Sequence, residues 1–428
     1  MMPASISRYL ASRGIRGPWK IAGTDRGDFR GAIVIPALAE RDSLLATISS
    51  LAENPPDLLS RFLILIVVNH RRDANQDDKA DNRETLALLS GKKGISPALQ
   101  IGWVDAASPG LEFPAQNGGV GLARKIGFDL ALPHLSFRET PPLLVSLDAD
   151  TLVRPDYLPA VAGHFREAKE GGAVIPFCHQ KGGTPEEESA IRRYELFLRL
   201  YVLGLERAGS PYAFHTVGST MTCRAEAYAR MGGMNQRKAG EDFYFLQHLA
   251  KTAGVCKIAG TVVYPSPRVS HRVPFGTGPS VARLTAGESG AVLFYRPECF
   301  QILKDWLALV AGNPESEGEN ILLKGRRISE ELDLFLTRVR FATTWEKLRA
   351  NFRSPALLLK GFHHWFDGLK TLRLVHQLSG GPYPRGEPGS VVSAFLKWAG
   401  LGPLEGIAAQ LSLLRRIQIG GHEHLLFS

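Results

Sequence analysis

Cysteine is scarce in this sequence, with 4 residues among 428. These residues lie far apart and form no Cys-x-x-Cys pair; they are Cys178, Cys223, Cys256 and Cys299. This spacing argues against a zinc knuckle and is typical of free thiols in a reducing cytoplasm. We therefore expect all of them to be packing residues in a cytoplasmic protein.

Long apolar runs are also missing. No stretch of about 18 apolar residues occurs, so the sequence predicts no membrane-spanning helix. Residues 1–20 contain basic side chains but no uninterrupted apolar core, which makes them a poor export signal. A peripheral position at the inner face of the membrane stays open.

Basic residues outnumber acidic ones, 51 to 42, which gives a formal net charge of +9. Such an excess suggests an anionic partner, which could be nucleic acid, lipid headgroups or a phosphorylated small molecule. The basic residues are spread through the chain, and no recognisable nucleic-acid-binding module accompanies them. We therefore expect no nucleic-acid partner.

From about residue 30, short apolar runs alternate with segments of helical periodicity. The near-continuous apolar run at 61–70 predicts a buried central strand. Further strands are predicted at 31–40, with a sharp stop at Pro36, and at 99–108, 143–150 and 171–177. Helices are predicted at 41–51, 84–90 and 117–132, and the polar segment 71–83 predicts a surface loop. This alternation is typical of an open α/β sheet.

After about residue 290 the pattern becomes helical. Apolar residues recur at steps of four, three and four in two successive sets: Ile328, Leu332, Phe335 and Val339, then Phe341, Trp345, Leu348 and Phe352. The arginine- and aromatic-rich segment 328–376 has two interpretations, the core side of a helical cap or a face resting on an anionic membrane. We expect an N-terminal extension at 1–29, a catalytic domain at 30–290 and a helical region at 291–428.

Two carboxylates follow the apolar run 143–147, namely Asp148 and Asp150. At the end of a buried strand such a pair suits a metal and diphosphate site, the aspartate pair of a haloacid-dehalogenase-type phosphatase, or an ordinary helix cap. The phosphatase pattern runs Asp-x-Asp-Gly-Thr, whereas Thr151 directly follows Asp150 here. The strand is also the fourth in order, which weakens the phosphatase interpretation.

A second acidic pair, Glu241 and Asp242, opens a predicted helix after a Gly232-Gly233 stop and a loop. A carboxylate at a helix N-terminus is favoured by the helix dipole, which keeps its pKa low unless burial opposes it. Capping alone explains one acid at this place, so the second one needs another reason.

The segments IVIPALAE, LDAD, VGSTMTCRAEAYARMGGMN and GEDFYFLQHL together resemble the successive blocks of family 2 glycosyltransferases with a GT-A fold. The resemblance covers roughly residues 30–275, and its specificity lies in the order and spacing of the blocks. It implies a GT-A nucleotide-diphospho-sugar transferase fold, an open and mostly parallel sheet flanked by helices, here with a mainly helical C-terminal extension. The Gln-x-x-Arg-Trp block of processive members is absent, which implies a soluble, non-processive member.

Residue by residue, the resemblance implies four roles for the acidic residues. Asp150 would bind a divalent metal, and Asp148 would contact the ribose or the water shell of the metal. Asp242 would be the catalytic base, and Glu241 would shape the acceptor pocket beside it.

The resemblance also implies contacts with the nucleotide. Pro36 and Glu40 match the exit of the first strand, which wraps the base. Gly121, Arg124 and Lys125 match a Gly-x-x-x-Ala-Arg block, in which the basic side chain approaches the nucleotide.

Two further positions complete the expected site. Asn69-His70 stands where many members carry an Asp-Asp pair, and Asn69 can still form a hydrogen bond with the base or ribose. His271 lies where enzymes of this fold often bring a histidine to the metal, although a lone histidine beside Arg272 is equally compatible with an ordinary loop residue.

These inferences predict an inverting, metal-dependent glycosyltransferase that moves a single sugar from a nucleotide-diphosphate sugar to an acceptor hydroxyl. The expected cofactor is Mn²⁺ or Mg²⁺, because a divalent cation neutralises the departing diphosphate. The acceptor would be a saccharide or a lipid-linked molecule. The alternatives are a catalytically inactive nucleotide-sugar-binding scaffold and the weaker phosphatase interpretation.

Overall fold

The computed structural model describes residues 2–91, 94–116, 118–269 and 276–420. Two compact units share the chain. The first, here called the α/β unit, contains Met1–Gly183, Thr216–Pro279 and Arg416–Ser428, and the second, the helical unit, contains Thr184–His215 and Ser280–Arg415. The helical unit therefore includes the segment 184–215, which the sequence analysis placed inside the catalytic domain, and it begins again about ten residues before position 290.

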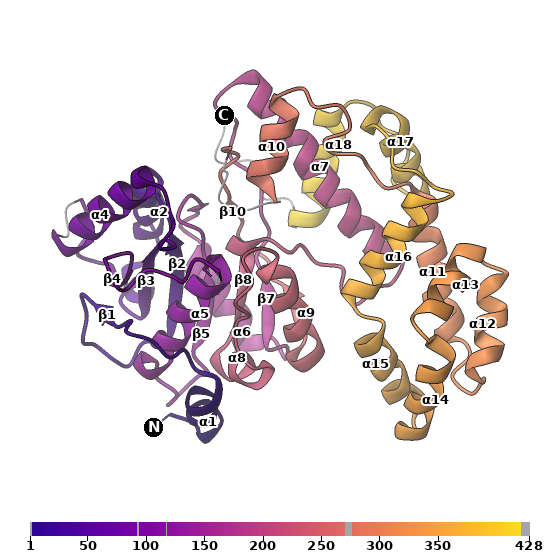
Figure 1. Cartoon of the computed structure of the whole chain (residues 1–428), viewed down its shortest axis with the longest axis horizontal. Helices are drawn as coiled ribbons and strands as arrows, with labels where there is room; N and C mark the ends of the chain where they lie inside the picture. The colour runs from indigo at the N-terminus through magenta and orange to yellow at the C-terminus, as the bar shows by residue number, and fades with distance from the viewer. Residues whose placement is uncertain (1, 92–93, 117, 270–275, 421–428) are drawn as a thin grey trace. The chain divides into compact units, whose positions relative to one another are not determined.

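The α/β unit is built on an eight-stranded sheet of order β1-β4-β3-β2-β5-β8-β7-β9 among the described residues (Figure 1). Its strands are β1 Ile21–Ala22, β2 Gly31–Ala37, β3 Phe62–Asn69, β4 Gln100–Ala106, β5 Leu143–Ser146, β7 Gly172–Val174, β8 Met221–Arg224 and β9 Val255–Lys257. The central strands β4, β3, β2 and β5 are parallel, whereas β8 is antiparallel to β5 and β7. A separate antiparallel ladder joins β6 Leu152–Val153 to β10 Val263–Tyr264.

Strand β3 is buried along its whole length and lies between β2 and β4, as its apolar sequence predicted. Strand β2 continues past Pro36 to Ala37, so the predicted stop falls one residue early. Pro36 is tolerated because the pairing of β2 with β5 ends at Val34, which leaves the proline beyond that ladder. The parallel arrangement brings the carboxyl ends of β2, β3 and β5 to one edge of the sheet.

Helices cover the sheet of the α/β unit. They are α1 Ala4–Arg13, α2 Arg41–Ala52, α3 Pro56–Leu59, α4 Gln76–Gly91, α5 Val120–Ala131, α6 Tyr157–Glu167, α8 Ala225–Met231 and α9 Glu241–Ala253. Helix α5 packs directly on β2 and β3. The predicted α/β fold, with a mostly parallel sheet flanked by helices, is thereby confirmed.

Helix α4 corrects the prediction of a surface loop over 71–83, because it begins at Gln76. The side chain of Asn75 accepts a hydrogen bond from the backbone N–H of Asp78 at 2.7 Å, which satisfies one of the unpaired groups at the helix start. Asp77 and Asp78 lie in the first turn, where the helix dipole favours negative charge. Polar composition thus marked a helix N-terminus here rather than a loop.

The helical unit combines α7 with the orange and yellow helices of Figure 1. Its helices are α7 Pro185–Arg207, α11 Pro297–Ala311, α12 Gly318–Arg326, α13 Glu330–Arg338, α14 Phe341–Asn351, α15 Pro355–Trp365, α16 Gly368–Gly380, α17 Pro388–Trp398 and α18 Ile407–Arg415. Helix α10, Thr277–Thr285, contains the sequence boundary between the two units, which falls after Pro279. A π-helical turn, Arg416–Gly420, follows α18.

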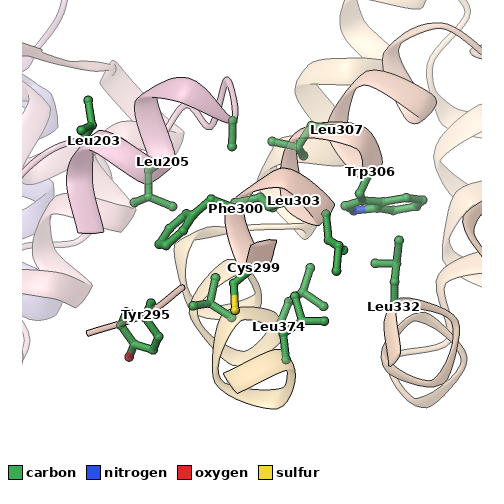
Figure 2. Close-up of a cluster of buried hydrophobic side chains, with 14 of the residues drawn as sticks. Leu203, Leu205, Tyr295, Cys299, Phe300, Leu303, Trp306, Leu307, Leu332 and Leu374 are labelled. Atoms are coloured by element: carbon green, nitrogen blue, oxygen red, sulfur yellow. The ribbon is translucent and has the colours of Figure 1, made fainter. Parts of the chain in front are cut away.

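The core of the helical unit is rich in aromatic rings. Figure 2 shows Phe300 and Trp306 of α11 among leucines of the same helix and of α7, α13 and α16. The rings of Trp306 and Phe341 meet edge to face with centroids 4.9 Å apart, and Trp345 is fully buried. The aromatic residues of the 328–376 segment therefore serve as core, which favours the helical-cap interpretation.

All cysteines are free thiols, as expected, and Cys223 and Cys299 are buried. No helix among the described residues has both the length and the apolar character needed to cross a lipid bilayer.

A buried ion pair in the helical unit gives a stability prediction. Glu195 on α7 is inaccessible to solvent and binds Arg199 on the same helix and Arg415 on α18, each at 2.8 Å. Glu195→Ala leaves both guanidinium groups without this carboxylate, so we expect a loss of about 3–5 kcal/mol in the free energy of unfolding, measured by urea titration.

The control is Glu188→Ala, which removes a glutamate with the same i,i+4 arginine pairing from the first turn of the same helix, where its side chain is 25% exposed. Its expected cost is below about 1 kcal/mol. Equal losses in the two variants would show that the buried pair contributes no more than a surface pair.

Candidate active site

Asp148 and Asp150 lie in the turn that leaves strand β5 at the carboxyl edge of the sheet. The turn is closed by a hydrogen bond from the N–H of Thr151 to the carbonyl of Asp148 at 3.1 Å. Ser219 donates to Asp148 Oδ2 at 2.7 Å, and its hydroxyl also meets that of Thr151. The side chains of Asp148 and Asp150 are 33% and 21% exposed, so both carboxylates remain accessible to a ligand.

Arg124 joins these aspartates to the second acidic pair. Its side chain extends from α5, is only 2% exposed and forms ion pairs with Asp148 and Glu241. Its Nε donates a third hydrogen bond to Ser146 Oγ at 2.8 Å. Each nitrogen of the guanidinium thus has a partner in the protein. Its approach to the nucleotide stays a prediction. Arg124 is a positioning residue that links β5 to α9.

Two glycines make room for this arrangement. A Cβ atom at Gly218 would lie 2.2 Å from Arg124 Nη2, so any side chain there would displace the guanidinium. A Cβ atom at Gly121 would lie 2.6 Å from the carbonyl oxygen of Arg237. Gly121 therefore permits α5 to approach the loop that leads into α9, and the described structure gives it this packing role.

Glu241 and Asp242 begin α9, as predicted, after Gly240 in the left-handed conformation with φ 70°. Glu241 is buried against Arg124 and positions that arginine. Its place beside the acceptor pocket stays a prediction. Asp242 is half-buried, and its Oδ1 accepts a hydrogen bond from the N–H of Phe243 at 2.7 Å.

The pKa of Asp242 is raised to about 7, first because burial penalises the charged carboxylate and second because Glu241 carries a like charge. Burial likewise raises the pKa of Glu241, against the attraction of Arg124. At this helix N-terminus burial therefore outweighs the dipole. A carboxylate whose pKa lies near neutrality is suited to accept a proton from a substrate.

Asp150 is held by an arginine that the sequence analysis did not single out. Arg268 follows β10, and its Nε donates to Asp150 Oδ2 at 2.9 Å. Its Nη2 forms an ion pair with Glu40, which is buried at the start of α2. Gln180 donates to the carbonyl oxygen of Asp150 at 2.9 Å. Arg268 lies three residues before His271. This closeness to the expected metal ligand is the sequence feature that could have identified Arg268 as a site residue.

The predicted nucleotide contacts at the ends of β2 and β3 form a buried polar network. Asn69 donates to the carbonyl oxygens of Val67 at 2.9 Å and Ala37 at 3.2 Å, which fixes the two strand ends to each other. Asn82, which sequence reasoning missed, donates to the carbonyl oxygen of Asn69 and meets His70 Nδ1, each at 2.9 Å.

Burial lowers the pKa of His70, so the ring in this network is neutral at pH 7. Pro36 and Glu40 flank the same edge of the sheet, at the end of β2 and the start of α2.

Two predicted site residues fall elsewhere. The ammonium group of Lys125 is buried and bonds to Asp129 Oδ2 and the hydroxyl of Tyr9, each at 2.8 Å. The hydrogen bond to Tyr9 ties α5 to α1. Contact of Lys125 with the nucleotide stays a prediction. His271 lies outside the described residues.

The carboxylates at the end of β5 fit a divalent cation. Among the described residues no three His, Cys, Asp or Glu side chains converge as a ready-made metal site. Mg²⁺, however, is usually held by one or two carboxylates together with substrate phosphates and water. Asp148 and Asp150 supply such hard oxygen ligands, and the side chains of both are partly exposed.

No family model and no curated protein matches this chain. Solved structures that it is similar to include S. aureus TarS 1–349 in complex with UDP-GlcNAc, at 14% identity over 83% of this chain and 93% of that chain, with a TM-score of 0.37. A mannosyltransferase from Pyrobaculum calidifontis in complex with GDP-Man and Mn²⁺ has 15% identity over 85% and 93% of the two chains, with a TM-score of 0.37.

Glucosyl-3-phosphoglycerate synthase from Mycobacterium tuberculosis, in complex with Mn²⁺, UDP and glucosyl-3-phosphoglycerate, has 15% identity over 66% and 80% of the two chains, with a TM-score of 0.34. Likenesses this low establish neither a family nor an activity. The function proposed below therefore rests on the side chains and topology of this chain.

The electrostatics of the acidic pair can be tested directly. Replacing Glu241 by Gln removes the like charge beside Asp242, so we expect the pKa of Asp242 to fall by about one pH unit. The measurement is an NMR titration of the side-chain carboxyl carbons. Glu53→Gln, at an exposed position of the same unit, is the control and should leave this pKa unchanged. An unchanged or higher pKa in Glu241→Gln would contradict the assigned cause.

Proposed function

We propose that the α/β unit transfers a single sugar residue from a nucleotide-diphosphate sugar to an acceptor hydroxyl with inversion at the anomeric carbon, and that Asp242 is the general base. One observation carries this proposal. The buried guanidinium of Arg124 bonds Asp148 and Glu241, so the strand-end aspartates and the start of α9 meet in one site. A carboxylate with a pKa near neutrality then lies beside groups suited to the donor.

The proposed reaction is a single displacement. The acceptor oxygen attacks the anomeric carbon and forms the new glycosidic bond, while its proton passes to the carboxylate of Asp242. The bond from the anomeric carbon to the diphosphate breaks, and its electron pair leaves with the nucleoside diphosphate. Attack opposite the leaving group inverts the configuration.

The predicted cofactor, Mn²⁺ or Mg²⁺, belongs to the same proposal. When bound, a divalent cation supplies positive charge against the departing diphosphate. Asp150 and Asp148 would hold it, because they carry the accessible carboxylates at the end of β5. Asn69 and His70 would then border the nucleoside at the ends of β2 and β3.

The proposed partners are the nucleotide-sugar donor and a saccharide or lipid-linked acceptor. We propose a cytoplasmic location, and a lipid-linked acceptor would add peripheral contact with the inner face of the membrane. The phosphatase alternative is disfavoured because Thr151 follows Asp150 directly, where the Asp-x-Asp-Gly-Thr pattern has a glycine.

The test is transfer from UDP- and GDP-sugars to saccharide and lipid-linked acceptors, with the anomeric configuration of the product read by NMR. In Asp242→Asn we expect transfer to fall about 10²–10⁴-fold, because the base is lost, while donor binding measured by calorimetry is retained. Asp57→Asn removes another aspartate from the first turn of a helix and should transfer normally.

Wild-type rates in Asp242→Asn would remove Asp242 from the mechanism. Donor binding by the wild type without transfer to any acceptor would favour the inactive scaffold.

The pH dependence follows from the pKa of the base. Asp242 must be deprotonated to accept a proton, so we expect kcat/KM to rise with pH and to level off above about 7. In Glu241→Gln the rise should move to lower pH, because the pKa of Asp242 falls. Initial rates between pH 5 and 9 at constant ionic strength test this, and a flat profile through this range would contradict it.

A further inference from the structure

The guanidinium of Arg268 lies between two carboxylates from different parts of the α/β unit. Its Nε donates to Asp150 Oδ2 at 2.9 Å, and its Nη2 pairs with Glu40. Asp150 follows β5, Glu40 begins α2 and Arg268 follows β10. Three segments that are distant in sequence are therefore joined by one cation at the carboxyl edge of the sheet.

Arg268 differs from Arg124 in what it can still bind. Arg124 is 2% exposed and bonds protein groups through each of its nitrogens, whereas the side chain of Arg268 is 32% exposed. A guanidinium offers five donors in a planar fork that matches phosphate oxygens. Arg268 can therefore reach a ligand at this edge.

Asp150 is also the carboxylate that a divalent cation would use. A carboxylate oxygen bonded to a guanidinium is a poorer metal ligand, because the ion pair must be given up and two positive charges would come close together. Binding of the ion and pairing with Arg268 are thus mutually opposed, and such opposition is reciprocal by thermodynamic linkage.

We propose that Arg268 is an internal counter-cation that competes with the divalent ion for Asp150 and, once displaced by the ion, binds the diphosphate of the donor. This inference rests on the proposed function. In the metal-free protein Arg268 compensates Asp150 and the buried Glu40. With metal present, the same charge is available to the phosphates, so metal binding and donor binding are coupled through one side chain.

The proposal predicts opposite effects of one substitution on two affinities. In Arg268→Gln the competitor is gone, so Mn²⁺ alone should bind about fivefold more tightly or better. UDP or GDP at saturating Mn²⁺ should bind about tenfold more weakly, because a charge-assisted contact with phosphate is lost. A purely structural role for Arg268 would weaken both.

The experiment uses the full chain. Binding of Mn²⁺ alone is followed by the EPR signal of the free ion, and binding of UDP, GDP and the corresponding monophosphates is followed by calorimetry. Arg268→Lys keeps the charge and should return the Mn²⁺ affinity toward the wild-type value, which also identifies any folding defect of Arg268→Gln. Arg230→Gln removes one exposed arginine from α8 and is the control for net charge.

The outcomes separate the two proposals. Unchanged or weaker Mn²⁺ binding by Arg268→Gln, or no Mn²⁺ binding by the wild type, overturns the competition. Unchanged diphosphate binding by Arg268→Gln overturns the phosphate contact. If the wild type binds Mn²⁺ but no nucleoside diphosphate, the proposed transferase function fails, while the Mn²⁺ comparison still decides whether Arg268 competes for Asp150.

Discussion

The buried charge of Arg124 is the constraint that organises the site. A guanidinium with almost no exposed surface is stable only if carboxylates and hydrogen-bond acceptors surround it, because removing a charge from water is costly. Asp148 and Glu241 provide the carboxylates and Ser146 provides a further acceptor. Since these residues come from α9 and from strand β5 and the turn after it, satisfying one cation fixes the two halves of the site relative to each other.

The burial that surrounds Arg124 also raises the pKa of the neighbouring carboxyl groups of Glu241 and Asp242. Asp242 lies beside Glu241 in surroundings that penalise charge, and the attraction of Arg124 offsets only part of that penalty. Among the described residues, the carboxylates of Asp148, Glu241, Asp150 and Glu40 share the two arginines Arg124 and Arg268. Burial first, and the like charge of Glu241 second, account for a base that titrates near neutrality.

Sequence patterns were sufficient for the framework of the α/β unit. The apolar run of β3, the strand end at Asp148 and the helix start at Glu241 are local features, because each depends on periodicity, glycine placement or capping within a few residues. The block order also identified the acidic residues that the structure brings together around Arg124.

Side-chain direction and long-range pairing could not be predicted in the same way. Arg124 and Lys125 are adjacent, and neighbours on a helix point about 100° apart, so the two cannot face one ligand from the same face. Nearly all of α5 is buried, so the helix has no polar face. The sequence pattern therefore could not show which of the two residues points toward the site. Arg268 has partners at positions 40 and 150, a relation that only the tertiary structure reveals.

The packing of α1 makes the first residues of the chain part of the site's support. The hydroxyl of Tyr9 meets Lys125 and Asp129 on α5, and it fills the space that a Cβ atom at Gly233 would need, 1.9 Å away. Gly233 in turn begins the loop that leads into α9. Helix α1 thus links the helix that carries Arg124 to the loop that precedes Asp242. We therefore expect that trimming the N-terminus during protein production would weaken the support of both residues.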